Sequence, residues 1–160
     1  MACDMFLKID GITGETSADG MSGYMSILSF SFGVSNATTV GPGSGGLTGG
    51  RSSLSDFSVM KSTESASTDL FLHCASGKSY ASAEVVIRKA TGDGGQQTFL
   101  KYSFTNIMIT SVQWSGGGDE PTEALSFAFQ AVTIEYSKQG DDGSMTPSGN
   151  CTWDQTKVKS

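Results

Sequence analysis

The spacing of apolar positions predicts a protein made mainly of β-strands. Within 25–34, bulky side chains recur at every second position and small or polar residues stand between them. A period of two places alternate side chains on opposite faces of a strand. The apolar positions of this segment are Leu28, Phe30, Phe32 and Val34. On similar grounds, further strands are expected at 5–9, 56–61, 84–90, 98–114 and 125–136.

One segment has the spacing of a helix instead. Leu70, Phe71 and Cys74 fall at positions i, i+1 and i+4, so they share one side of a helix. Ser67 is placed to cap the first turn, and Gly77 stands just beyond the last. We expect this single helix to flank the strands.

The two longest predicted strands change their buried face midway. In 98–114, Leu100, Tyr102 and Phe104 share one phase, whereas Ile107 and Ile109 share the other. In 125–136 they occupy odd positions up to Phe129 and even positions from Val132. Such a slip indicates a bulge or a bend. The predicted fold is a compact β-barrel, or a sandwich of two sheets that share strands, with one flanking α-helix.

Length and charge narrow the class of protein. A chain of 160 residues is enough for one core, so we expect a single domain over 1–160. The net charge of −6 and the sparse cations argue against nucleic acid as a partner, because phosphate backbones are bound by clustered Lys and Arg. The first ten residues lack a basic leader followed by a long apolar run, so no secretory signal peptide is expected. No stretch reaches membrane-spanning length, so no membrane insertion is expected.

Glycine and cysteine add two further expectations. Many of the 21 glycines cluster between strands, and 37–53 shows no regular period. We therefore predict an extended glycine-rich loop at 37–53 and a polar C-terminal tail at 140–160, in which 152–158 is a candidate edge strand. The three cysteines are odd in number and form no C-x-x-C pair, which indicates neither a complete disulfide framework nor a zinc site.

The sequence contains matches to catalytic and phosphate-binding motifs, but these matches lack the neighbouring elements that such sites need. The stretch 41–46 matches G-x-G-x-x-G, and 45–52 approaches a phosphate loop with Arg51 in place of Lys. Both motifs need a helix directly after the loop, but none is expected before Ser67. His73 is the single histidine, and no nucleophile or orienting carboxylate is placed beside it by the sequence. We therefore expect that the protein is not an enzyme and that it has no catalytic residue, cofactor or metal site.

Several segments together form a recognisable pattern: M-x-x-D-M-F-L-K-I-D-G-I-x-G-E at 1–15, ILSFSFG at 27–33, CASGK at 74–78, AEVVIRKA at 83–90 and the strands at 109–112 and 125–136. Through these segments the chain as a whole resembles the haemolysin-coregulated protein (Hcp) family of bacterial type VI secretion.

This resemblance implies a structural role. Members of the family form a small β-barrel flanked by a helix, and six copies close into a ring. Rings stack into the inner tube of a contractile machine that also has a sheath and a spike at its tip, and the lumen can hold small effector proteins. The resemblance thus implies a homohexamer that is made in the cytoplasm and secreted through the machine without a signal peptide.

The resemblance also assigns two groups of residues. Ser31 falls where the family has a lumen-facing serine, and Ser29 and Ser35 are its inferred neighbours. The face opposite the core in 25–34 is expected to hold Ile27, Ser29, Ser31 and Gly33, which are mostly small and uncharged.

Related proteins have an extended loop near 37–53 that reaches the next ring. In this chain Val40 and Leu47 would be its apolar contacts and Arg51 its polar contact.

Two other classes stay open on sequence grounds. A β-barrel that binds a small ligand would show the same alternation, and an enzyme with a phosphate loop is the third possibility. Particle size separates a ring from a ligand barrel, and a nucleotide-binding assay tests the third.

Overall fold

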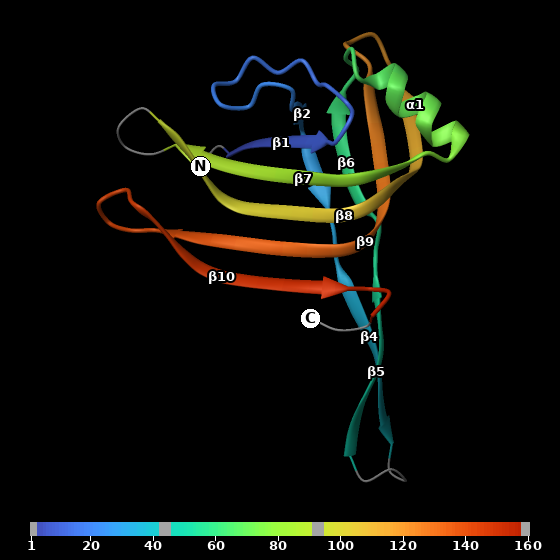
Figure 1. The fold of residues 1–160 in the computed structure, drawn as a ribbon, viewed down its shortest axis with the longest axis vertical. Coiled ribbons are helices and arrows are strands. Elements are labelled where there is room, and N and C mark those ends of the chain that lie inside the picture. The colour runs from blue at the N-terminus through green and yellow to red at the C-terminus, as the bar shows by residue number, and fades with distance from the viewer. Residues whose placement is uncertain (1–2, 42–45, 91–94, 158–160) are drawn as a thin grey trace.

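The computed structural model describes residues 3–41, 46–90 and 95–157, and it is mostly β with one helix (Figure 1). Its elements are β1 (Cys3–Ile9), β2 (Met25–Ile27), β3 (Ser29–Ser31), β4 (Val34–Gly41), β5 (Gly46–Leu54), β6 (Phe57–Ser62), α1 (Ser67–Ser76), β7 (Ser79–Ala90), β8 (Gln96–Ser115), β9 (Thr122–Gln139) and β10 (Met145–Asp154). One sheet runs β2-β1-β7-β8-β9-β6-β3, with β10 also on β9, and it curls into a nearly closed barrel. The pair β4-β5 forms a separate sheet.

The inside of the curved sheet is filled by aromatic rings. Phe57 is fully buried, and its ring centroid lies 5.1 Å from that of Phe104 and 5.5 Å from that of Phe127. The ring of Phe30 stacks on that of Phe57 with centroids 5.6 Å apart, and Tyr102 packs beside both rings. Aromatic side chains bury large areas, and such pairs add about 0.5–1.5 kcal/mol beyond burial. The strand expected at 56–61 is therefore confirmed as β6, and Phe57 and Val59 are both buried on it.

The predicted helix is confirmed, but its first turn differs from the expectation. Gly77 ends α1 in a left-handed conformation with φ 72°, as its position predicts. Ala66, not Ser67, is the N-cap residue, and no side chain caps the helix. Ser67 is buried, and its hydroxyl donates to Glu123 at 2.9 Å. A polar contact inside the fold has therefore replaced the local cap.

The change of face in the two long strands is confirmed as a bend that both strands share. Asn106 has φ 50°, a left-handed conformation that Asn tolerates better than most residues. Its amide donates to Gln130 Oε1 on β9 at 2.7 Å, which joins the strands at the turning point. A register shift at Ile109–Ser111 adds a bulge farther along β8. The bend lets each strand contribute to two walls of the barrel.

The prediction of one continuous strand over 25–34 was wrong. Met25 and Ile27 are buried on β2, which pairs with β1, whereas β3 pairs with β6. The chain passes between these two neighbours at Leu28, whose amide donates to Met60 O. Leu28 is consequently exposed rather than in the core, and Val34 is exposed as well. The alternation in the sequence continues through this break and so conceals it.

The segment 37–53 was expected to lack regular structure, but its described residues lie in strands β4 and β5. These strands form a hairpin that projects from the barrel along the longest axis of the molecule (Figure 1). Asn36 stabilises a bulge in the hairpin, because its side chain accepts from Gly50 N at 2.9 Å and donates to Gly50 O at 3.0 Å. A Cβ on Gly50 would lie 2.0 Å from the Ala37 carbonyl oxygen, so this bulge requires glycine.

The C-terminal tail forms the edge strand that was expected, but over a different range. β10 pairs with β9 from Met145 to Asp154, so it begins earlier than the predicted 152–158. Val158 lies outside the described residues.

Candidate functional surfaces

A row of four serines crosses the sheet on the face opposite the core. The register pairs Ser31 with Ser58, Ser58 with Ser126, and Ser126 with Ser111, on β3, β6, β9 and β8 in turn. The hydroxyls of Ser58 and Ser126 lie 2.9 Å apart. We call these four residues the serine row.

Uncharged side chains continue this face on one side of the serine row. The next row holds Ser29, Met60, Ala124 and Gln113, and the row after it holds Ser62, Thr122 and Ser115. All are at least partly exposed. We call the three rows together the outer face. It can offer hydroxyl hydrogen bonds and one flexible thioether, Met60, but no ion pair.

The structure brings together two of the three predicted lumen residues. Ser29 and Ser31 are exposed on the outer face. Ser35 is exposed too, but it lies on β4 of the hairpin, where its hydroxyl donates to Ser53 O at 3.5 Å. Ile27, expected on this face, is buried instead. The rest of the serine row was missed, because the alignment of distant strands is not visible in the sequence.

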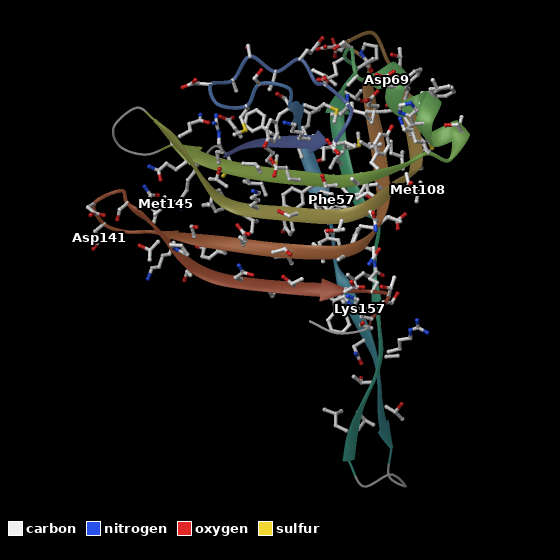
Figure 2. All side chains as sticks on the ribbon, in the orientation of Figure 1. Phe57, Asp69, Met108, Asp141, Met145 and Lys157 are labelled. Atoms are coloured by element: carbon white, nitrogen blue, oxygen red, sulfur yellow. The ribbon has the colours of Figure 1, made fainter. Side chains whose placement is uncertain are left out.

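Two of the three predicted stacking residues form a pair on the hairpin. Val40 and Leu47 are opposite each other in the register, and they are 76% and 75% exposed. Arg51 is exposed nearer the root of the hairpin. Side chains of the hairpin extend from the ribbon well away from the barrel (Figure 2).

A groove lies at the root of the hairpin. It has a volume of about 370 Å³ and is bounded by the hairpin on one side and by β9 and β10 on the other. Its walls are almost wholly apolar and include Phe32, Val34, Leu54, Ile134 and Trp153. Cys151, an exposed free thiol, also borders it.

A buried ion pair lies at the α1 end of the barrel. Lys61 Nζ and Glu123 Oε1 are 2.5 Å apart, and both side chains are fully buried. Lys61 also donates to Ser67 Oγ at 3.2 Å, and Trp114 Nε1 donates to the second oxygen of Glu123. These contacts satisfy both charges, as burial of charged groups requires.

Glu64 lies near this ion pair. Burial raises the pKa of Glu64, and the positive charge of Lys61 partly opposes that shift.

The single histidine packs against the barrel. His73 Nδ1 is hydrogen-bonded to the Tyr80 hydroxyl, and the two ring centroids are 5.5 Å apart. The imidazole therefore packs between α1 and β7.

In 3–41, 46–90 and 95–157, no group of three or more His, Cys, Asp or Glu side chains is placed to hold a metal ion. No helix within the same ranges is long and apolar enough to cross a membrane.

Comparison with known proteins identifies the class of protein. Residues 6–136 match the family described as Type VI secretion system effector, Hcp. The chain therefore belongs to the Hcp family. It is 33% identical over 145 residues to Protein hcp1 of Pseudomonas aeruginosa. The matched region covers 89% of this chain and 88% of that relative.

Solved structures agree with this assignment. A type six secretion system protein superposes with a TM-score of 0.88 at 30% identity, and Hcp1 from Salmonella typhimurium with 0.79 at 31%. Each match covers 99% of both chains. The family consists of secreted structural proteins and not of enzymes, which confirms that expectation for this chain.

Proposed function

We propose that six copies of this chain close into a ring, and that rings stack into the inner tube of the type VI machine with the outer face toward the lumen. The observation that carries this proposal is the outer face itself, where small uncharged side chains continue across four strands. A wall of this kind can contact varied effector proteins without binding any of them strongly, because it has neither clustered charge nor a large apolar patch.

Ring closure requires a head-to-tail contact between unlike surfaces of neighbouring copies, because such contacts close into rings when the rotation permits. In this proposal residues 1–160 act as one domain. Its partners are its own copies, the sheath, the spike and effector proteins. It leaves the cytoplasm through the machine.

The hairpin supports the stacking part of the proposal. A two-stranded hairpin is at best marginally stable alone in water. This one extends away from the barrel (Figure 1), and Val40 and Leu47 are exposed in its outer half. Contact with an adjacent ring would bury both side chains and offset the cost of ordering the hairpin.

Light scattering combined with negative-stain electron microscopy tests ring formation. We expect particles of six-fold monomer mass with a central channel at micromolar concentration. A monomer or a symmetric dimer over that range would overturn the proposal. A monomer would favour the ligand-barrel alternative, although aromatic rings fill the described interior of the barrel where such a ligand would bind.

Substitution of Ser31 tests the lumen assignment. Because Ser31 is exposed, Ser31→Gln should leave the ring intact and reduce retention of a co-expressed effector. Ser22→Gln is the matched control, since Ser22 is exposed in the segment between β1 and β2 and does not lie on the outer face. Equal retention by both variants would contradict the assignment.

Removal of the hairpin end tests stacking. Deletion of 43–50 should preserve ring mass, because long surface segments contribute little to a core, but should abolish tubes and secretion. Tube formation equal to that of the parent would show that the hairpin is not needed for stacking.

A further inference from the structure

The geometry points to the surface that receives the hairpin. We infer that the Val40 and Leu47 pair of one copy packs on an aromatic platform, formed by Phe71 of α1 and Trp114 of β8, in a second copy of this chain. This inference rests on the proposed stacking function and names the contact on which stacking depends.

The platform consists of two large rings that remain accessible. Phe71 and Trp114 stack with centroids 5.5 Å apart and an angle of 28° between planes. Phe71 is 55% exposed and Trp114 is 50% exposed. Leu72, the next residue of α1, is exposed as well. Trp and other aromatic side chains with this much accessible area are the residues that most often dominate protein interfaces.

The buried ion pair fixes the orientation of this platform. Trp114 Nε1 donates to Glu123, and Glu123 is paired with Lys61 inside the fold. The indole is thus anchored at its polar edge while half of its surface meets solvent. A side chain held in this way loses little conformational freedom when a partner binds, so more of the contact energy appears as affinity.

The two apolar sites lie at opposite ends of the molecule. The hairpin extends to one end of the longest axis, and α1 lies at the other end on the same side of the view (Figure 1). A second copy displaced along that axis therefore brings its hairpin to the α1 end of the first. Contacts between unlike surfaces that repeat by translation generate filaments, as stacking requires.

Charge complementarity favours the same pairing. The sequence 34–54 contains one charged residue, Arg51. At the opposite end, Asp69 on α1 is exposed (Figure 2). Asp119 and Glu120, between β8 and β9, are also exposed. Arg51 is attracted to these three carboxylates, which outnumber the exposed Lys78 just after α1.

The groove at the hairpin root is the main competing receiver. It is apolar and accessible, but it lies between β10 and the hairpin of its own copy. A hairpin arriving along the longest axis would have to pass the α1 end and most of the barrel before it reached the groove. The arriving hairpin therefore contacts the aromatic platform before it can reach the groove.

Site-specific photocrosslinking in the full-length chain distinguishes the two receivers. Benzoylphenylalanine at Leu47 should crosslink, in stacked rings, to peptides that contain Phe71 or Trp114 of another copy. The matched control carries the probe at Thr39, which is exposed on the other face of the hairpin and should give several-fold less of the same product. Crosslinks to β9 and β10 at the groove, or no crosslink between copies in stacked rings, would overturn the inference.

Variants of the platform provide a second test. Phe71→Glu should keep ring mass, because Phe71 is largely exposed, and should raise the ring concentration needed for stacking at least about ten-fold, as expected for loss of an interface hot spot. Asp69→Lys should weaken stacking, and Asp69→Lys with Arg51→Glu should restore part of it. If Phe71→Glu stacks like the parent, the inference fails while the tube function stands. A parent that never forms rings or stacks would overturn both.

Discussion

The barrel and the hairpin are both antiparallel β-structure, yet they are stabilised in different ways. In the barrel, Phe57 and its neighbours bury their rings against one another. In the hairpin, the bulkiest side chains of the outer half, Val40 and Leu47, are about three-quarters exposed. Strand pairing alone therefore does not indicate where the stability of the fold resides. The barrel carries its own core, whereas the hairpin presents apolar surface that a partner can bury.

The largest expected effect concerns the buried charges of the barrel. Lys61→Met should lower the free energy of unfolding by about 3–5 kcal/mol, because Glu123 would remain buried without its partner. Urea denaturation of the ring subunit measures this loss. The double variant Lys61→Met with Glu123→Leu should recover more than half of it, since no charge is then left unpaired. A cost below about 1 kcal/mol for the single variant would indicate that water reaches the pair.

A smaller effect is expected at the bend of the barrel. Asn106→Val should cost about 1–3 kcal/mol, because a β-branched residue disfavours φ 50° and the hydrogen bond to Gln130 is lost. Asn106→Gly is the control, since glycine tolerates this conformation and should cost less. Thermal unfolding of the three proteins gives the order, and equal costs for both variants would show that the backbone conformation is unimportant.

A substitution in the hairpin should change the free energy of unfolding much less than a substitution in the core of the barrel. Leu47→Ser should change the unfolding free energy of isolated rings by no more than about 0.5 kcal/mol, because an exposed side chain has no packed neighbours to lose. The same urea titration measures it. A loss as large as that of Lys61→Met would erase the distinction between the two regions.

The smallest effect is a local dependence on pH after β10. Hydrogen bonds, chiefly from the Thr156 hydroxyl, lower the pKa of Asp154 to about 2. A lowered pKa stabilises the folded turn above the unfolded value near 4, and this contribution disappears as the pH falls through about 2. Amide NMR shifts of Thr156 and Lys157 should follow this titration in the parent. Asp154→Asn should remove the transition, and its persistence would assign it to another group.

Sequence reasoning succeeded where side chains repeat within one strand. The alternation in 56–61 correctly predicted a strand with Phe57 and Val59 on one side, which is the buried side. The shared change of phase located the bend near Asn106. These features depend on neighbours along the chain. A period of two is a local property of backbone geometry, so the sequence displays it directly.

Features that depend on pairing between distant strands were missed. Lys61 and Glu123 meet because β6 and β9 align in one register. That register also builds the serine row, of which the sequence indicated one member, Ser31. The hairpin was missed for a different reason. Its glycines and small polar residues show no apolar alternation, because nothing in its own chain covers its outer half.

The serine row affects how easily another molecule can move along this face of the sheet. Neighbouring strands are ~4.8 Å apart, so the same hydroxyl recurs at that interval across the sheet. A molecule lying on the row that slips sideways by one strand meets nearly the same donors and acceptors again. The interaction energy therefore varies little along such a path and has no deep minimum. We therefore expect a protein resting on this face to slide over it with little resistance.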